Sequence, residues 1–475
     1  FREQFEPYTE QAAATTDSQT QRWRCRTCGY IHTGSEPPDR CPVCGAFGEQ
    51  FEPYTEQAAA TPSSASQAGK VVVVGAGIAG VSAVESIRLS SSTEVALMSQ
   101  DPQLPYYRLN LTRYLAGEIT EGDLPLHPAG WYDEQNVRLK LGVAVKSIDA
   151  DAKTVALSDG SSESFDKLVL TVGADPFVPP IAGADKENVT TVRTLDDAQR
   201  LLALVGDGAT CVCIGGGILG LETAGALTRR GAAVSLLEGD DWLMPRQLNA
   251  DAARILADYV TDRGIELYPK ANVQQITGDR QARGVRLADG SELPADVVII
   301  ATGVRSNVAL AKQAGLTTNM GIVVDDHLVS SHPDILAAGD VAEHRKTVYG
   351  LWAPAQFQGN IAGINAVGGQ AEFGGIPPSN ILKVLGIDLF SIGQFDPTGG
   401  ADADADADVI DQECDGKYLR FVFRDGRLIG AILLGDMSAA QAVQKAVESA
   451  TDLSDLLARK PTAADLAGHF TENAS

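Results

Sequence analysis

The sequence of 475 residues has no run of about 18 or more apolar residues, so no stretch of it is suited to span a bilayer. Positive charge is also scarce, because 38 lysines and arginines are outnumbered by 62 aspartates and glutamates, a formal net charge of −24. Binding of nucleic acid relies on Lys and Arg to neutralise phosphates, so this balance argues against it. With 44% hydrophobic residues, 21% charged residues and 48 glycines, the composition instead fits a globular α/β protein.

Cysteine is sparse, and its placement does not suggest a disulfide framework. Four of the seven cysteines form two CxxC pairs, Cys25 with Cys28 and Cys41 with Cys44. This usage points to metal chemistry in a reducing compartment, and we expect the cytoplasm. Two CxxC knuckles can place four thiolates tetrahedrally around one ion, but tetrahedral sulfur alone does not separate iron from zinc.

A thirteen-residue segment, EQFEPYTEQAAAT, occurs twice, at residues 3–15 and 49–61. A repeat at a constant offset is the mark of a duplicated unit. We therefore expect a gene with tandem metal modules, of which the start of this chain keeps a tail; the alternative is a recombination that copied only the tail. Residues 55–69 lack aromatic and branched apolar side chains and predict a flexible linker with a typical span of roughly 20–23 Å.

Two glycine fingerprints predict two sites for dinucleotides. In KVVVVGAGIAGVSAVESIRL and again in ATCVCIGGGILGLETAGAL, an apolar strand leads through a GxGxxG turn into a helix. The dipole and the free N–H groups of such a helix N-terminus suit a pyrophosphate. One fingerprint is weak evidence, but two that lie about 140 residues apart imply two dinucleotides. Their glycines are Gly75, Gly77 and Gly80, and Gly215, Gly217 and Gly220.

The residue after the next strand differs between the two motifs. After the second, AVSLLEG places Glu238 where a carboxylate can accept both hydroxyl groups of an adenosine ribose, which favours NADH over NADPH. After the first, EVALMSQD offers Ser99, which can make only one such contact well, and Asp101 two residues on. Recognition of the ribose is therefore expected to be weaker at the first site.

The order of GAGIAG, LVLTVGADP, GGGILGLE, VVIIATGVRSN and ILAAGDVAEH across residues 70–370 resembles the two-dinucleotide flavoprotein superfamily of pyridine-nucleotide oxidoreductases. The resemblance implies FAD at the first site and NADH at the second. It also implies that Asp340 accepts hydrogen bonds from the ribityl chain of the flavin and that Glu222 lies near the nicotinamide ribose, although an ordinary acid in the first turn of a helix is an alternative for Glu222. Gly173 and Gly303 fall in the loops that join the two nucleotide domains, and Val145 is included in the expected FAD site.

Within this superfamily the disulfide reductases carry a redox-active cysteine pair, which this chain lacks. Residues 76–110 contain no cysteine, and Cys211 and Cys213 alternate along one strand, as in a packed core. LPYYRLNLTRYLAGE and LLEGDDWLMPRQLN are similar to segments of NADH:rubredoxin oxidoreductases and of the nitrite reductase large subunit. This resemblance implies that Arg108 contacts FAD, with a surface salt bridge as the alternative, and places Arg113, our predicted catalytic residue, where relatives commonly carry a flavin-side Lys.

The cysteine module carries a resemblance of its own. CRTCGYIHTG and CPVCGA resemble the rubredoxin domain of rubrerythrins over residues 23–54, which implies an Fe(Cys)4 site built from Cys25, Cys28, Cys41 and Cys44. Residues 376–459 resemble the small C-terminal domain of the same reductases, with expected strands at 417–423 and 427–434 and a helix from about residue 438.

The predicted fold is α/β, with two Rossmann-like, three-layer dinucleotide-binding domains, a small α+β C-terminal domain and a small N-terminal rubredoxin-like iron module. The predicted boundaries are residues 1–19 for the tail of a repeated unit and linker, 20–54 for the rubredoxin-like domain, 55–69 for the flexible linker, 70–190 and 300–375 for the FAD-binding domain, 191–299 for the NADH-binding domain and 376–475 for the C-terminal domain.

The leading functional hypothesis is electron transfer. NADH gives a hydride to FAD, and single electrons then pass to the fused iron site and to an external redox protein, such as a rubredoxin-dependent oxidase, peroxidase or hydroxylase. Two alternatives stay open: an NADH oxidase or peroxide reductase whose cysteine module only docks a partner, and a reductase that carries a zinc-ribbon interaction domain.

Overall fold

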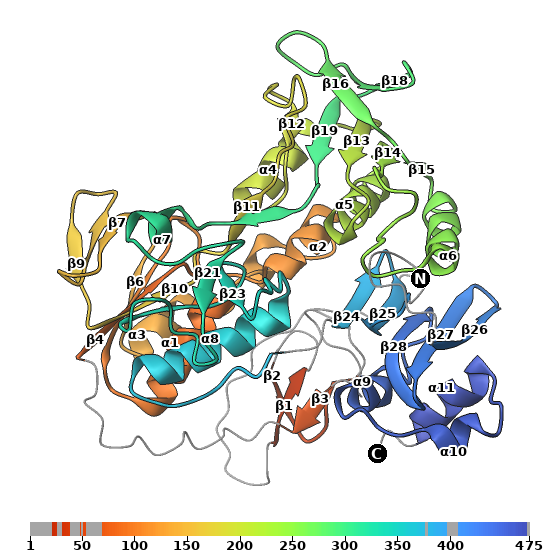
Figure 1. Ribbon diagram of the computed structural model, residues 1–475. Coiled ribbons are helices and arrows are strands. Elements are labelled where there is room, and N and C mark those ends of the chain that lie inside the picture. The colour runs from red at the N-terminus through yellow and green to blue at the C-terminus, as the bar shows by residue number, and fades with distance from the viewer. Residues whose placement is uncertain are drawn as a thin grey trace. The chain divides into compact units, whose positions relative to one another are not determined.

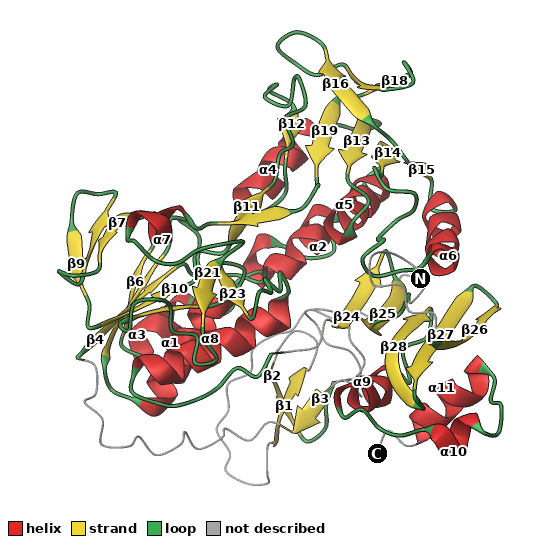
Figure 2. Cartoon of the chain, viewed as in Figure 1, coloured by secondary structure: helices red, strands yellow, loops and turns green. Residues whose placement is uncertain are grey.

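The structure is a computed structural model in which residues 21–25, 31–38, 48, 51–53, 69–375, 379–396 and 407–472 are described (Figure 1). The chain divides into two units, Phe1–Gln57 and Ala58–Ser475. Figure 2 marks the helices and strands of both units. In the described segments, no helix combines the length and the apolar character that crossing a bilayer requires.

The first unit contains a three-stranded antiparallel sheet in the order β2-β1-β3. Its strands are β1 (Gln21–Cys25), β2 (Ile31–Gly34) and β3 (Phe51–Pro53). The indole N–H of Trp23 donates to the carbonyl of Gly34 at 3.2 Å, and Phe51, from the second copy of the repeated segment, is buried opposite Cys25. Part of the repeat is therefore a strand of this sheet. The predicted tail at residues 1–19, and all of the predicted linker except Gly69, lie outside the described residues.

The second unit begins with a five-stranded parallel sheet in the order β22-β10-β4-β5-β6. Its strands are β4 (Lys70–Val74), β5 (Glu94–Met98), β6 (Val137–Lys140), β10 (Lys167–Leu170) and β22 (Ile335–Ala337). The Val-rich run of β4 is fully buried, as expected for a central parallel strand with both faces covered. Residues far apart in the sequence thus build one nucleotide-binding domain.

Two long helices of this domain, α1 (Ile78–Ser90) and α8 (Trp352–Ala366), run side by side (Figures 1 and 2). Glycine makes this close contact possible. A Cβ atom at Gly359 would lie 2.3 Å from the carbonyl oxygen of Ala79, and one at Gly363 would lie 2.3 Å from that of Ala83. The backbone of α8 therefore rests almost directly on the helix that follows the first glycine fingerprint.

Smaller elements complete this half of the unit. They are the sheet β7 (Val145–Asp149), β8 (Thr154–Leu157) and β9 (Ser162–Ser164), the pair β21 (Ile322–Val324) and β23 (Ala342–His344), the helices α2 (Leu111–Leu115), α3 (Ala129–Glu134) and α7 (Ala309–Gln313), and the 3-10 helices η2 (Arg108–Asn110) and η3 (Glu121–Asp123).

A second five-stranded parallel sheet, in the order β12-β19-β13-β14-β15, carries the second fingerprint. Its strands are β12 (Val189–Thr190), β13 (Thr210–Ile214), β14 (Ala233–Leu237), β15 (Ile265–Tyr268) and β19 (Val297–Ile300). The helices of this domain are α4 (Leu195–Leu204), α5 (Ile218–Arg229) and α6 (Ala250–Thr261), and a small sheet of β16 (Val273–Thr277), β17 (Gly284–Leu287) and β18 (Glu292–Pro294) adjoins them. The chain enters and leaves this domain through the antiparallel pair β11 (Ala174–Pro176) and β20 (Val304–Ser306).

The C-terminal part is an antiparallel sheet in the order β24-β25-β28-β27-β26 with helices packed on it. Its elements are β24 (Ser379–Val384), β25 (Ile387–Gly393), β26 (Asp408–Cys414), β27 (Lys417–Arg424), β28 (Arg427–Leu434), α9 (Ala440–Glu448), α10 (Ser454–Leu457) and α11 (Ala463–Glu472). Phe390, Phe421 and Phe470 fill the core between the sheet and the helices. The strands and the helix expected from the sequence form within a few residues of their expected bounds.

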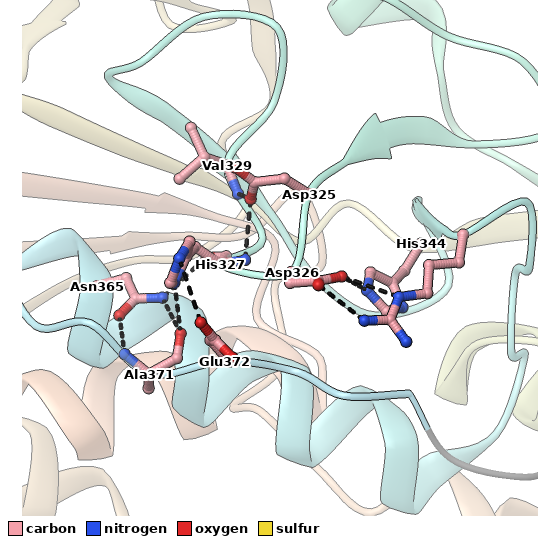
Figure 3. A network of polar contacts seen from close by, with 9 residues as sticks. Asp325, Asp326, His327, Val329, His344, Asn365, Ala371 and Glu372 are labelled. Atoms are coloured by element: carbon pink, nitrogen blue, oxygen red, sulfur yellow. Dashed lines mark hydrogen bonds and ion pairs between the residues drawn. The ribbon is translucent and has the colours of Figure 1, made fainter.

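A polar network joins α8 and the chain after it to the loop that follows β21 (Figure 3). Asp326 accepts from the guanidinium of Arg345 at 2.7 Å, and its Oδ1 lies 2.8 Å from Nε2 of the fully buried His344. These contacts lower the pKa of Asp326 to about 2. The side-chain amide of Asn365, near the end of α8, donates to the backbone carbonyl of Ala371 and accepts from its backbone N–H. None of these residues lines the cavity described next.

Candidate functional site

A cavity of about 1690 Å³ lies along the carboxyl ends of both parallel sheets. Residues of both glycine fingerprints line it, and so do the ends of β4, β5, β13 and β14. Ligands of open α/β sheets bind at this edge, where the strands end and the helices begin. The fold therefore brings two motifs that are remote in the sequence to one continuous space.

The first fingerprint is shaped by close backbone contacts. Gly75 has φ +104°, and a Cβ atom there would lie 2.3 Å from the carbonyl oxygen of Thr171; a Cβ atom at Gly80 would lie 1.9 Å from the carbonyl oxygen of Gly75. At Gly77, by contrast, no atom lies within 4 Å of an added Cβ. Gly77 is the N-cap of α1, with no side chain bonded to the cap and no acid in the first turn. The free N–H groups of α1 therefore face the cavity, ready for a phosphate.

The second fingerprint repeats this geometry. Gly215 has φ +115°, a Cβ atom at Gly220 would lie 1.9 Å from its carbonyl oxygen, and Gly217 is the open N-cap of α5. Two helix N-termini of the same design thus point into the same cavity, as the two fingerprints predict.

Glu238 lies at the end of β14 and is 9% exposed. One carboxylate oxygen accepts from the backbone N–H of Gly216 at 3.0 Å, and the other accepts from the N–H of Asp240 at 2.9 Å. Each oxygen keeps a further lone pair for a ligand. The carboxylate is therefore held rigidly beside the second fingerprint, in the place expected for a partner of the adenosine ribose.

At the first site the equivalent groups also make hydrogen bonds within the protein. The hydroxyl of Ser99 accepts from the N–H of Asp101 at 3.1 Å. Asp101 accepts from the hydroxyl of Tyr106 at 3.1 Å, and the guanidinium of Arg108 lies 3.8 Å away. Burial raises the pKa of Tyr106 to about 12, so this tyrosine remains a neutral donor. Ser99, Asp101 and Arg108 all line the cavity, as expected.

Arg193 is a cavity residue that the sequence analysis missed. Its guanidinium donates to Asp340 at 3.0 Å, and its carbonyl accepts from Arg108 at 2.8 Å. It stands directly before Thr194, the N-cap of α4, in a capping box with Asp197. A basic residue before a helix cap carries no signal of cofactor binding, and the pairing with Asp340 depends on the tertiary fold.

One aromatic residue of the cavity lining was also missed. Trp352 begins α8 and lines the cavity, and its ring stacks on that of Tyr107 with centroids 5.6 Å apart and planes 21° apart. A flat aromatic wall of this kind suits a planar ring system. The sequence gives no spacing signal for it, since the two rings come from segments 245 residues apart by number.

The remaining predicted residues divide into those inside and outside the cavity. Val145, Gly173, Gly303 and Glu222 line it. Arg113 is absent from the described lining; its Nε donates to Glu118 at 3.2 Å on a partly exposed face of α2. Its catalytic role remains a prediction. Three of the four predicted metal ligands, Cys28, Cys41 and Cys44, and the side chain of Cys25, lie outside the described residues.

Cys211 and Cys213 belong to the buried strand β13. Burial raises the pKa of the Cys211 thiol to about 11 and raises that of Cys213 as well. Both thiols therefore stay protonated near neutral pH and act as small apolar side chains. This supports the prediction that they pack rather than carry electrons.

Comparison with known families gives three matches. The model described as "Pyridine nucleotide-disulphide oxidoreductase" matches residues 69–359, "Rubredoxin NAD+ reductase C-terminal domain" matches residues 378–451, and "Rubrerythrin, rubredoxin-like domain" matches residues 23–52. The third match includes all four cysteines of the two CxxC pairs.

Individual proteins agree with these matches. The chain is 34% identical over 389 residues to "Nitrite reductase [NAD(P)H]" of Bacillus subtilis, a match that covers 81% of this chain and 48% of the relative. The crystal structure of NADH:rubredoxin oxidoreductase from Clostridium acetobutylicum is 28% identical in sequence, with a TM-score of 0.70. The match covers 82% of this chain and 99% of that one. The crystal structure of a covalent putidaredoxin reductase–putidaredoxin complex is 26% identical in sequence, with a TM-score of 0.72. The match covers 82% of this chain and 95% of the matched chain. The chain spans about half the length of the nitrite reductase. The predicted fold class is confirmed.

Proposed function

Because the chain belongs to the pyridine nucleotide-disulphide oxidoreductase family, we propose that it transfers a hydride from NADH to FAD and then passes single electrons to its own rubredoxin-like iron site and on to an external redox protein. The observation that carries the proposal is the single cavity lined by both glycine fingerprints, in a chain that also bears the two CxxC pairs. Two nucleotides bound in one space can exchange a hydride directly.

The matches confirm the predicted enzyme class, a pyridine nucleotide-dependent flavoprotein oxidoreductase, and the predicted cofactors FAD, NADH and iron. FAD, when bound, supplies a ring that takes up two electrons as a hydride and can release them one at a time. The identity of the external acceptor, and the route of the electrons toward it, belong to the proposal.

The first site fits FAD in several respects. The open N-terminus of α1 at Gly77 receives a pyrophosphate without opposition from an acidic side chain. Asp340 and Arg193 form a pair of opposite charge at the cavity wall, which can offer both an acceptor and a donor to a polyhydroxyl chain. Trp352, whose ring stacks on that of Tyr107, provides a flat apolar surface for a ring. We assign FAD retention to these groups.

The second site fits NADH. Gly217 leaves the N-terminus of α5 open for the pyrophosphate, and Glu238 is fixed by two backbone amides so that its outer lone pairs can accept the hydroxyls of a ribose. A 2′-phosphate would place negative charge against this buried carboxylate. The site therefore selects NADH over NADPH.

Replacing Glu238 tests this selection. The unmutated protein is expected to use NADH with a kcat/KM at least tenfold above that for NADPH, because a hydrogen bond to a charged group contributes about 1.5–3 kcal/mol. Glu238→Gln keeps an acceptor oxygen for one of the two backbone amides. It should lower the ratio of kcat/KM for NADH to kcat/KM for NADPH by about tenfold. Asp241→Asn, which neutralises an exposed acid outside the cavity lining, is the matched control and should leave the ratio unchanged. Equal or better turnover of the unmutated protein with NADPH contradicts the assignment.

Rapid mixing of the full chain with excess NADH under anaerobic conditions tests the electron route. Ferric tetrathiolate is coloured and zinc is not, so its bleaching reports electron arrival. A short flexible linker gives an effective concentration on the order of millimolar, so the rate should stay constant over a tenfold range of protein concentration. A rate that rises in proportion to protein concentration refutes the intramolecular route. A colourless module that contains zinc instead supports an interaction domain.

A further inference from the structure

A two-residue turn of the C-terminal sheet reaches into the second nucleotide-binding domain. Leu385 and Gly386 join β24 to β25, and both have left-handed backbone conformations, with φ +51° and +96°. This is the geometry of a tight hairpin with a type I′ turn. Although it stands at a hairpin tip, where side chains are usually exposed, Leu385 is only 5% exposed and belongs to the core that surrounds α5 and α6.

The turn is held by contacts on two helices. The backbone N–H of Leu385 donates to Oε1 of Glu222 on α5 at 3.0 Å, and its carbonyl accepts from the hydroxyl of Tyr259 on α6 at 3.3 Å. Its side chain lies over Gly225, where an added Cβ would come within 1.9 Å of Cδ2 of Leu385. Glycine within a helix costs roughly 0.5–1 kcal/mol relative to alanine, and here the close approach of Leu385 requires it.

Glu222 connects this turn with the cavity. It lies on α5 beyond the open N-cap Gly217, whereas Glu238 lies on the adjoining strand end, and all three line the cavity. A dinucleotide with its adenosine ribose on Glu238 and its pyrophosphate at Gly217 has its nicotinamide half left to place, and Glu222 is an acceptor along that path. A carboxylate on a free rotamer would be a poor guide for it, but the Leu385 N–H restrains this one.

We propose that the Leu385–Gly386 turn is a positioning element for NADH binding: by donating to Glu222, it aims the other carboxylate oxygen at hydroxyl or amide donors of the nicotinamide half. This inference rests on the proposed function and deepens it. The C-terminal domain thereby takes part in the nucleotide site through one backbone amide. Leu385 itself does not touch the nucleotide.

The charge of Glu222 responds to the same contact. Desolvation raises the pKa of Glu222 above its ordinary value, while the N–H of Leu385 and the charge of Arg229 on the same helix lower it and Glu118, after α2, raises it. Loss of the Leu385 hydrogen bond therefore raises the pKa further. The pH below which NADH binding weakens should then move upward, because a protonated carboxyl has lost acceptor capacity.

A set of variants isolates the turn. Gly225→Ala forces Leu385 away, so the KM for NADH and the dissociation constant for NAD+ measured by calorimetry should rise about tenfold, while kcat falls by less than about threefold. Leu385→Ala removes the three atoms that a Cβ at residue 225 would meet, so the Gly225→Ala/Leu385→Ala double variant should regain most of the affinity. FAD content should be unchanged in all of them.

Glu222→Gln separates positioning from simple structural support. In the Glu222→Gln background, Gly225→Ala should add less than about twofold to KM and should no longer shift the pH profile, since the carboxylate on which the turn acts is gone. Hydrogen exchange of the Leu385 amide, measured in the full chain, should speed up in Glu222→Ala, and this readout holds even if Gly225→Ala does not fold.

Additive effects of Gly225→Ala and Glu222→Gln, or unchanged exchange at Leu385 in Glu222→Ala, overturn the inference. A normal KM for NADH in a folded Gly225→Ala variant does the same. Failure of the unmutated chain to oxidise NADH overturns the proposed function instead, so the two failures are distinct.

Discussion

The contact between α1 and α8 sets up a strong prediction for Gly363→Ala. The added Cβ would lie 2.3 Å from the carbonyl oxygen of Ala83, so the helices must separate by about 1 Å to restore a normal contact. Overpacking of this kind costs about 1–3 kcal/mol, and the better helix propensity of alanine returns roughly 1 kcal/mol. We expect a net loss of up to about 2 kcal/mol, and a fall in the melting temperature of up to roughly 8 °C.

The assay is thermal unfolding of the full chain, followed by circular dichroism and by the fluorescence of released flavin. Because α1 carries the first fingerprint, flavin release should shift together with unfolding. Gly468→Ala in α11 is the matched control, since an added Cβ there meets no atom within 4 Å. That variant should gain roughly 0.5–1 kcal/mol. If Gly363→Ala were as stable as Gly468→Ala, the helices could not be packed as closely as the structure has them.

Three further predictions follow from the modular design and from the ion cluster around the buried Glu163. Cys41→Ser should weaken or bleach the iron signal and leave the flavin content intact; loss of FAD together with iron, in metal and flavin analysis, would argue against independent domains. A chain that starts at Lys70 should still bind FAD and reduce ferricyanide with NADH, and failure to do so would place part of the hydride machinery upstream. Desolvation raises the pKa of Glu163, but hydrogen bonds from Lys70, Arg138 and Lys140 outweigh it and lower the pKa to about 2. Glu163→Gln should therefore cost about 2 kcal/mol at pH 6, and this cost should fall as the pH is lowered from about 4.5 and vanish below about pH 2, as a pH series of denaturant unfolding would report.

The residues predicted from the sequence at the two fingerprints are those whose role is local. A GxGxxG turn needs glycine because its own backbone approaches itself: an added Cβ at Gly80 meets the carbonyl of Gly75, and one at Gly220 meets that of Gly215, at the same 1.9 Å. The need for glycine is therefore determined within six consecutive residues. For this reason both turns, the strands before them and the helices after them could be predicted from the sequence.

The contacts that the sequence did not reveal join distant segments. Arg193 and Asp340 are 147 residues apart, and Leu385 and Glu222 are 163 residues apart. Neither pair has a spacing rule, because each depends on how one domain or sheet is placed against another. Arg113 illustrates a different limit. It was identified by resemblance, but resemblance at a position does not determine whether the side chain there points into the cavity. Its pairing with Glu118 could not be read from the motif.

The two nucleotide sites differ in how far binding depends on a single side chain, and this difference fits the roles of their proposed ligands. At the first, Ser99 offers only a hydroxyl and Asp101 is paired with Tyr106 and Arg108, so a nucleotide there is held by many groups of modest individual effect, from Gly77 to Asp340. A cofactor that stays bound through every turnover needs such distributed retention rather than discrimination. At the second, Glu238 keeps lone pairs free at a fixed position. NADH must bind, be distinguished from NADPH and dissociate as NAD+ in every turnover. A single rigid carboxylate supplies this selectivity without the many contacts that would slow the release of NAD+.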